Sequence, residues 1–518
     1  MKNSIRILAA FAAVLMLLGV VACGNTGSGN ESTAPENTAI IDTGDDSGEE
    51  GTAANVDKDG FLLDDLPNDL KFNETVRILY WNDVERPEFE VLEDQLDGNI
   101  VSEAIYSRNI NTEAKLGVTF EWTGQPGNSG ERANFTQFVM NSYKDNSSFD
   151  IIAAYSRTAG MLSRRGLLVD MNSIDKNYID TDKPWWPSAL VDAVTIDGSL
   201  YFISGDISTN VLHFMYAIYY NIELLDQYHI EDPVNLVDSK QWTIDKLIEL
   251  TTDTYQDADS DTKVSVGDFY GFASIYYHLD AFYTGSGLTL INPDSEDMMV
   301  ISPDYFGDKE VNLVDKLGKW LTTNSCYISR KSKAVDYYYP FVEGRGLFCQ
   351  NRVYMADSSY GAKNGHNLNS VTWNYGIVPT PLYDADQENY VTVIGNPFTL
   401  WGIMSGVSDD RASMATAVIE CMGSQAYRRT TPALFETNMK YRYTNSGENK
   451  FARMFDILHN TISFDLGRIF SDDMIFMSEI PSIAASEGNN WAIVGKSYKT
   501  QLDARLKALI KEFEGIKK

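Results

Sequence analysis

The sequence predicts an α/β protein whose folded body is built as two lobes or domains. Its 518 residues exceed the length at which a single hydrophobic core stops growing, about 250–300 residues. Residues 149–155 form a near-continuous apolar run, which is typical of a strand buried on both faces of a parallel sheet. An alternation of strands and helices begins at residue 76 and starts again near residue 214, which indicates two sheets.

The first sheet is expected to begin with the β-rich segment 76–81, which opens the folded body. Helical spacing follows over 91–116, and a second strand over 118–122. The buried run 149–155 is the next strand, and 161–168 is the helix after it. Elements in this order predict an α/β architecture with right-handed crossovers.

The second half of the chain restarts the pattern. Strands are predicted over 214–220, 353–356 and 375–379. Helices are predicted over 222–228, 242–255, 311–321, 411–422 and 502–513. In the helix over 242–255, Thr243 is a suitable N-cap because its hydroxyl oxygen can accept from a backbone N–H of the first turn.

Composition and charge exclude several classes of protein. Hydrophobic residues make up 43% of the chain and charged residues 22%, which argues against wholesale disorder and against a polytopic membrane protein. The net charge is −31. A body this acidic is repelled by phosphate backbones, so we expect no nucleic-acid partner.

The N-terminal segment predicts export. Lys2 and Arg6 precede an apolar run over 7–22 that is short for a membrane span. The run ends in small residues followed by Cys23, which resembles a bacterial lipobox, where the signal is cleaved and the cysteine receives a lipid. The alternative is a plain signal peptide with a chance cysteine.

The segment after Cys23 favours the lipoprotein interpretation. Residues 24–56 are rich in Gly, Ser, Thr, Asn and acidic residues and contain no basic residue, as expected of a flexible tether. We therefore predict a signal peptide over 1–22 and a lipidated Cys23 with a disordered acidic tether over 23–58. This order places the protein on the extracellular face of the cytoplasmic membrane, held to it only by the lipid.

Three further cysteines remain, Cys326, Cys349 and Cys421. An odd number permits at most one disulfide and leaves at least one free thiol. No CxxC spacing is present, so we interpret them as small buried hydrophobic residues.

Five segments, in order, carry a recognisable pattern. They are FDIIAAYSRTAGMLSRRGLLVDM, KPWWPSALVDAVTIDGSLYFISGDIS, AIYYNIELLDQYHIEDPVNLVDSKQWTIDKLIELT, FVEGRGLFCQNRVYMADSS and NYGIVPTPLYDADQENY. Together they resemble the family 1 extracellular solute-binding proteins, the capture components of sugar-type ABC importers. The resemblance covers nearly the whole body after the tether.

The resemblance implies a two-lobed periplasmic-binding-protein-like fold, type II-like, with hinged lobes around a ligand cleft. The first lobe would comprise 59–208 with 396–440, and the second 209–395 with 441–518, which includes the C-terminal helices. The chain would cross between lobes near 208–210 and 395–397. The implied function is a monomeric receptor that captures a carbohydrate, with an oligosaccharide as the expected ligand, and delivers it to ABC permease subunits without covalent chemistry.

Candidate ligand-binding residues follow from where the resemblance places the site. A sugar needs an aromatic plate for its apolar face and fixed donors and acceptors for its hydroxyl rim. Loops after the first-lobe strands and at the crossover supply such residues, as do the Trp-Trp segment and the segment around residue 373. The candidates are Trp81, Asn82, Asp83, Tyr155, Ser156, Arg157, Trp186, His213, Tyr216 and Trp373. The alternative is that these aromatics belong to the core and the polar residues to ordinary loops.

Some aromatics are weaker candidates. Trp185 and Trp186 are neighbours in an extended stretch, so one is expected in the core while the other faces the cleft. Tyr276, Tyr277 and Tyr354 are further aromatics that packing alone would explain.

An acidic loop carries a separate signal. Oxygen donors stand at positions 1, 3, 5, 9 and 12 of an EF-hand-like loop, and position 7 would offer its backbone carbonyl. The six residues are Asp257, Asp259, Asp261, Lys263, Ser265 and Asp268. Thr262 replaces the turn glycine and Asp268 the bidentate glutamate. The loop predicts a structural Ca²⁺ site, and the alternative is a solvated acidic loop.

The sequence shows no common catalytic motif. HExxH, GxSxG, a Walker loop and a GxGxxG after a strand are all missing, and the five histidines are isolated from one another. A secreted glycoside hydrolase needs only two carboxylates, but its barrel would show eight strand–helix units. An extracellular sensor or adhesin with the same fold is the other alternative to a transport receptor.

Overall fold

The computed structural model describes residues 55–516 except 85, 97, 146–147, 294–298, 332–334, 359, 362, 364 and 441–448. The predicted signal peptide, Cys23 and the tether up to residue 54 lie outside the described residues. Among the described residues, no helix is both long and apolar enough to cross a membrane.

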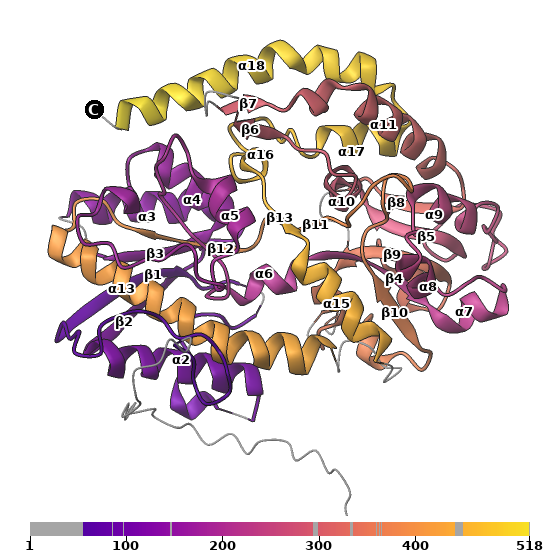
Figure 1. Ribbon diagram of the computed structural model, residues 1–518. Helices are drawn as coiled ribbons and strands as arrows, with labels where there is room; N and C mark the ends of the chain where they lie inside the picture. The colour runs from indigo at the N-terminus through magenta and orange to yellow at the C-terminus, as the bar shows by residue number, and fades with distance from the viewer. Residues whose placement is uncertain are drawn as a thin grey trace, which may run out of the picture. The chain divides into compact units, whose positions relative to one another are not determined.

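The first sheet has the strand order β12-β3-β1-β2 (Figure 1). Its strands are β1 (Glu74–Trp81), β2 (Val118–Gln125), β3 (Ile151–Tyr155) and β12 (Thr399–Ile403). β1 runs parallel to β2 and β3, and β12 runs antiparallel to β3. All five residues of β3 are buried, as its apolar run predicts.

Helices connect and cover these strands. They are α2 (Ile100–Leu116), α3 (Arg132–Lys144), α4 (Ser156–Arg164), α5 (Ser188–Val194) and α13 (Asp409–Gln425). The α2 helix begins later than the spacing over 91–116 predicts. Gly98 takes a left-handed φ of 83° and the Asn99 side chain accepts from Val101 and Ser102, so the preceding residues cannot join the helix.

The second sheet has the order β10-β4-β9-β5-β8. Its strands are β4 (Tyr216–Asn221), β5 (Tyr270–Ile275), β8 (Cys326–Ser329), β9 (Gly346–Arg352) and β10 (Tyr375–Val378). β5 is parallel to β8 and β9, whereas β4 is antiparallel to β9 and β10. The strand predicted over 353–356 is wrong: these residues form a 3₁₀ turn, and the strand is β9 just before them. The polar Gln350 and Asn351, both buried, hid that strand.

The remaining elements are short or lie outside the two sheets. The helices are α6 (Thr209–His213), α7 (Ile222–Gln227), α8 (Pro233–Asp238), α9 (Ile244–Thr251), α10 (Asp280–Gly285), α11 (Asp308–Leu321), α12 (Tyr339–Val342), α15 (Lys450–Asn460), α16 (Leu466–Ile469), α17 (Ile480–Glu487) and α18 (Trp491–Ile516). The short strands are β6 (Ile291–Pro293), β7 (Met299–Ile301), β11 (Thr392–Val393) and β13 (Ile462–Ser463).

Two chain segments that connect the sheets lie side by side. The first contains α6, and the second runs from β11 to β12. The backbone N–H of Gly395 donates to the carbonyl of Phe214 at 2.8 Å, and Met215 and Ile394 form an isolated β-bridge. These segments are where the resemblance predicted the crossings, while the lobe boundaries themselves stay a prediction.

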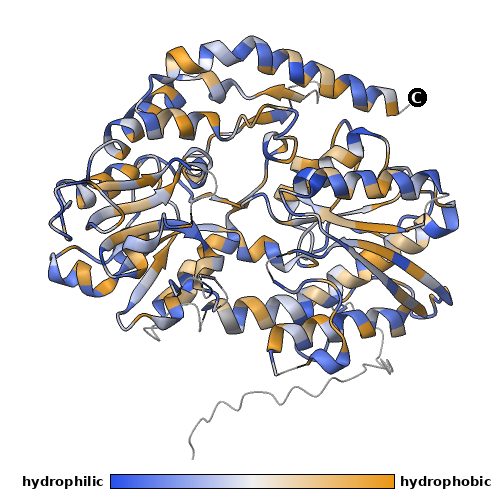
Figure 2. Cartoon of the chain, turned by 180° about the vertical axis from the view of Figure 1, so that it is seen from behind, coloured by the Kyte–Doolittle hydropathy of each residue, from blue (hydrophilic) through white to orange (hydrophobic). Residues whose placement is uncertain are grey.

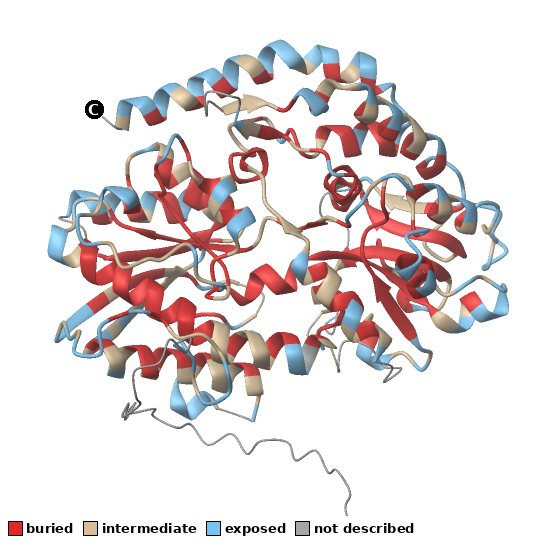
Figure 3. Ribbon diagram, in the orientation of Figure 1, coloured by how far each residue is buried: buried red, intermediate tan, exposed pale blue. Residues whose placement is uncertain are grey.

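The C-terminal helices contact elements around both sheets. α17 packs against α10 and α11, whereas α16 and α18 also touch α4 beside the first sheet. Figure 3 shows the central strands β3, β4 and β9 buried and one side of α18 exposed. Figure 2 shows hydrophilic and hydrophobic positions alternating along that helix. Cys326, Cys349 and Cys421 are buried free thiols, as predicted.

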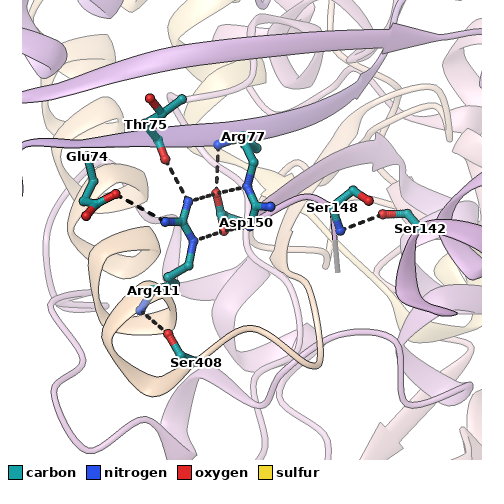
Figure 4. Close-up of polar contacts among 8 residues, drawn as sticks. All are labelled: Glu74, Thr75, Arg77, Ser142, Ser148, Asp150, Ser408 and Arg411. Carbon is teal, nitrogen blue, oxygen red and sulfur yellow. Dashed lines mark hydrogen bonds and ion pairs between the residues drawn. The ribbon is translucent and has the colours of Figure 1, made fainter. Parts of the chain in front are cut away.

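An ion-pair network fastens α13 to the amino-terminal edge of the first sheet (Figure 4). The buried carboxylate of Asp150 accepts from the guanidinium groups of Arg77 and Arg411, with distances of 2.6–3.1 Å. Arg411 also donates to the Thr75 carbonyl at 2.7 Å. Burial works to raise the pKa of Asp150, but the two arginines outweigh it and the pKa lies below its usual value. This network is structural, because it lies at the sheet edge opposite the strand ends that carry the candidate residues.

Candidate functional site

Trp81 and Tyr155 lie where β1 and β3 end, and they contact each other. Their rings meet edge-to-face with centroids 5.5 Å apart. The indole nitrogen of Trp81 donates to the hydroxyl of Thr399 at 2.9 Å. Trp81 is 0% exposed and Tyr155 3%. The two rings therefore pack against each other at the carboxyl edge of the first sheet and do not present an exposed aromatic face.

The polar residues after β1 shape the adjacent loop. One carboxylate oxygen of Asp83 accepts from the backbone N–H groups of Gly127 and Asn128, at 2.7 and 3.0 Å. Asp83 thereby fixes the loop after β2, while Asn82 beside it is exposed. Asn82 is thus the more accessible of the two predicted ligand-binding residues.

The residues after β3 connect the first sheet to later parts of the chain. The hydroxyl of Ser156 donates to the carbonyl of Asn396 at 2.6 Å, which ties α4 to the second crossing. The guanidinium of Arg157 pairs with Asp472, and Asp472 also pairs with Arg132 at the start of α3. The Nε atom of Arg157 is buried and has no hydrogen-bond partner among the described residues.

The turn over 470–479, between α16 and α17, contributes residues that the sequence did not single out. Besides Asp472 it carries Phe476, whose ring lies 4.8 Å from the guanidinium carbon of Arg157. Phe476 is 40% exposed. Ile475 and Phe476 both adopt left-handed backbone, with φ of 46° and 58°. Ser471, Asp472 and Asp473 are turn-favouring residues, but no glycine, asparagine or proline marks the left-handed positions of this turn.

The second sheet presents an aromatic cluster around Arg352, at the end of β9. Because β4 is antiparallel to β9, Tyr216 pairs with Arg352, and the guanidinium carbon lies 5.7 Å from the Tyr216 ring. Tyr277 and His278 follow the end of β5, and the His278 ring lies 5.0 Å from that of Tyr216. Burial and the nearby Arg352 lower the pKa of His278, which keeps this imidazole neutral.

Glu479, at the end of the turn over 470–479, interacts electrostatically with groups beside the first sheet and beside the second. Burial, with the neighbouring Asp280, raises the pKa of Glu479, while Arg157 works to lower it. Burial is the main cause of the raised pKa values of Tyr276 and Tyr277, and the negative charge of Glu479 raises them further. Glu479 is therefore within electrostatic range of Arg157 beside the first sheet and of Tyr276 and Tyr277 beside the second.

Two predicted ligand-binding residues lie elsewhere. Trp186 is buried in the core, where its indole nitrogen donates to Glu420 at 2.9 Å and its ring packs at Gly423 of α13. Trp373 packs against Phe341 and Tyr375. Tyr375 pairs with Asn221, at the opposite end of β4 from Tyr216, so Trp373 lies away from the Arg352 cluster.

His213 lies in a separate small pocket between residues of both lobes. The pocket is lined by Arg86, Pro87, Asn99, Val101, Ser102, His213, Asp357 and Leu434. Arg86 and Asp357 form an ion pair across it, at 3.3 Å. Burial lowers the pKa of His213 to about 4, so its imidazole is neutral and can both donate and accept.

The acidic loop brings three of its six predicted metal ligands together. Oxygens of Asp257, Asp259 and Asp261 lie within 4.8 Å of one another. Thr262, at the position of the EF-hand glycine, takes the left-handed φ of 63° that this turn requires.

The rest of the predicted ligand set fits less well. Asp268 is buried, and its carboxylate accepts from Ala258, Ser265 and Tyr255 within the loop. Lys263 donates its backbone N–H to Asp261, and the Ser265 hydroxyl donates to Asp259. The three aspartates thus fit a cation held partly by water, with Asp268 supporting the loop rather than closing the site.

Comparisons with known proteins show the fold and no sequence relative. No protein-family model matches the chain, and no curated protein matches it. A cyclo/maltodextrin-binding protein complexed with maltotetraose superposes with a TM-score of 0.51 at 14% identity, covering 85% of this chain and 96% of that one. A cyclic α-maltosyl-1,6-maltose binding protein from Arthrobacter globiformis gives 0.51 at 13% identity, covering 85% and 98%.

A third structural neighbour is the galacto-N-biose-/lacto-N-biose I-binding protein of an ABC transporter from Bifidobacterium longum, in complex with lacto-N-biose. Its TM-score is 0.52 at 11% identity, covering 84% of this chain and 97% of that one. Identities this low establish shared architecture alone. The predicted fold class is confirmed: the chain has the two-lobed periplasmic-binding-protein-like fold of the solute-binding proteins of ABC transporters.

Proposed function

We propose that this protein is an extracellular, lipid-anchored receptor that captures a carbohydrate, in the simplest case an oligosaccharide, and delivers it to an ABC-type permease. The observation that carries the proposal is the juxtaposition of aromatic and charged side chains at the strand ends of both sheets, in a fold shared with sugar-binding proteins. Arginines, carboxylates and tyrosine hydroxyls match the hydroxyl rim of a sugar, and the rings match its apolar face.

Binding is expected to work by lobe closure. A solute that contacts only one lobe does not favour the closed state, because a ligand shifts an equilibrium only by its differential affinity for the two states. Arg157 and Asn82 would engage the solute from the first lobe, and Tyr277 and Arg352 from the second. The closed complex is then the form that the permease subunits recognise.

The chain's role in this proposal is binding, with no reaction on the solute. The structural neighbours are described as binding proteins. The lipid on Cys23 would hold the receptor at the extracellular face of the cytoplasmic membrane, and a monomer suffices because both walls of the site come from one chain. A structural Ca²⁺ on Asp257, Asp259 and Asp261 is a subsidiary part of the proposal, supported by the grouping of their oxygens.

The test is a thermal unfolding screen of the purified protein against linear and cyclic malto-, xylo-, manno-, cello- and galacto-oligosaccharides, lacto-N-biose, and free hexoses. A ligand that binds only the folded state stabilises it by about 2.7 kcal/mol when the free ligand concentration is a hundred times Kd. The unfolding midpoint rises as a result. We expect a shift with one glycan family, confirmed by calorimetric titration. A cooperative transition that no glycan shifts would reject the carbohydrate assignment.

A further inference from the structure

Phe476 is an exposed aromatic held in an unfavourable backbone conformation. With 40% of its surface exposed, it is among the large hydrophobic side chains that the described structure leaves open. Ile475 before it and Phe476 itself both take positive φ values. A β-branched residue such as Ile475 or a bulky one such as Phe476 is an outlier in the left-handed region, and two in succession cost free energy that the surroundings must offset. Ordinary packing does not explain a strained turn that presents a ring to solvent.

The surrounding contacts hold this turn in place. The Phe476 backbone N–H donates to the carbonyl of Ser471 at 2.7 Å, and its carbonyl accepts from Glu479 at 2.8 Å. The hydroxyl of buried Tyr305 donates to the Met477 carbonyl at 2.6 Å. Asp472 anchors the other end of the turn through Arg132 and Arg157. Phe476 is therefore presented by a fixed turn.

One face of the Phe476 ring is covered by a cation. The guanidinium carbon of Arg157 lies 4.8 Å from the ring centroid, and Phe476 as a whole remains 40% exposed. An aromatic ring with a fixed backing is suited to the apolar C–H face of a pyranose ring.

The neighbours of Phe476 supply the polar half of such a subsite. Glu479 lies three residues later. Burial is the main cause of the raised pKa values of Tyr276 and Tyr277, and the charge of Glu479 raises them further. The hydroxyl groups of Ser471 and Ser478, at the two ends of the turn, are buried and lack hydrogen-bond partners among the described residues. Ser471, Ser478 and Glu479 are thus polar groups of the same turn as the ring.

We propose that Phe476 is the platform on which one pyranose ring of the solute stacks. The inference rests on the proposed carbohydrate function and names a residue for it. It makes the turn over 470–479 a wall of the binding site.

The experiment compares three variants with the parent protein. Phe476→Ala removes the ring, Phe476→Leu keeps apolar bulk without a flat face, and Phe476→Trp keeps a flat face. Ile483→Ala is the matched control, because Ile483 is 38% exposed on α17 and lies outside the proposed subsite. Each protein is titrated calorimetrically with the neutral oligosaccharide that gives the largest shift in the screen above, and its unfolding midpoint is measured without glycan.

We expect Phe476→Ala and Phe476→Leu to weaken binding about tenfold or more, equivalent to about 1.4 kcal/mol, with midpoints like the parent's. Phe476→Trp should stay within about threefold and should show an emission change on titration, because its new indole is exposed before binding. Ile483→Ala should bind as the parent does. Unchanged affinity in both the alanine and leucine variants would overturn the inference while leaving the carbohydrate function intact. A parent protein that no glycan shifts would overturn both.

Discussion

The side-chain amide of Asn210 donates a hydrogen bond to the buried carboxylate of Glu88. Asn210 lies in α6 in the first crossing, and Glu88 lies in the loop after β1. Burial raises the pKa of Glu88 to about 7, while the nearby hydroxyls of Ser208 and Thr399 work to lower it. Ser208 precedes α6 and Thr399 begins β12, so one carboxyl group contacts both connections between the lobes.

Glu88 predicts a pH dependence of stability. The folded-state pKa is raised from about 4.5 to about 7, so between these values the folded chain holds a proton that the unfolded chain has released. The stabilisation is complete below pH 4.5, falls as the pH rises and is lost above about pH 7, with a size on the order of 3 kcal/mol. Glu88→Gln stays neutral, so its unfolding midpoint should fall less than the parent's between pH 5 and pH 8.

The control for this experiment is Glu121→Gln, since Glu121 is exposed. Asp206 and Glu420 also have pKa values raised by burial, to about 7, and they contribute equally to the parent and both variants. Equal pH slopes for the parent and Glu88→Gln would show that Glu88 does not titrate in this range.

The ion pair between Arg86 and Asp357 predicts an effect on lobe closure. It joins the loop after β1 to the segment after β9, and the Asp357 side chain is only 6% exposed. Arg86→Gln removes this cation from a nearly buried carboxylate, which favours moving the lobes apart so that water reaches the charge. We expect a larger radius of gyration in solution scattering and a glycan affinity lowered several-fold.

A second substitution separates charge from packing at this pair. Asp357→Asn in the Arg86→Gln background removes the stranded charge, so the double variant should recover much of the compaction. If the single and double variants scatter identically, the ion pair does not set the lobe equilibrium.

The acidic loop predicts a calcium-dependent midpoint. Millimolar Ca²⁺ should raise the unfolding midpoint of the parent relative to excess chelator, because the ion binds only the folded loop. Asp257→Asn with Asp261→Asn should abolish this difference, while Asp386→Asn in another exposed loop should retain it. A parent midpoint that is the same in Ca²⁺ and in chelator would make the loop a solvated surface feature.

The lipid anchor is tested at the level of the cell. Cys23→Ser should move the protein from the membrane fraction to the medium or soluble fraction, and mass spectrometry of the parent should find a diacylglyceryl group on Cys23. Cys326→Ser is the matched control, because Cys326 is a buried free thiol. A parent protein without lipid would favour a plain signal peptide.

The sequence was informative where local composition decides structure. The run at β3 predicted a strand buried on both faces, and Thr243 accepts a hydrogen bond from Lys246 as the N-cap of α9. Family resemblance predicted the fold, which periodicity alone could not. β9 was missed because buried Gln350 and Asn351 break its apolar pattern.

Sequence reasoning placed the candidate residues at the carboxyl edge of the first sheet but could not tell which of them would be buried. Trp81 and Tyr155 look like ligand plates in sequence, yet pairwise packing and the bond to Thr399 bury them. Phe476 is more than 300 residues away in sequence from Arg157, which covers its ring. Such a contact depends on tertiary folding, and no local pattern encodes it.

The antiparallel strand β12 has a consequence for the order of assembly. All strands of the second sheet have been synthesised once residue 378 is made, but the first sheet, although it begins at residue 74, waits for residues 399–403 to complete its edge beside β3. The sheet that starts first is therefore completed last, across a loop closure of more than two hundred residues. A nascent chain that stops before residue 399 would expose the edge of β3, a surface that invites misassembly with other chains.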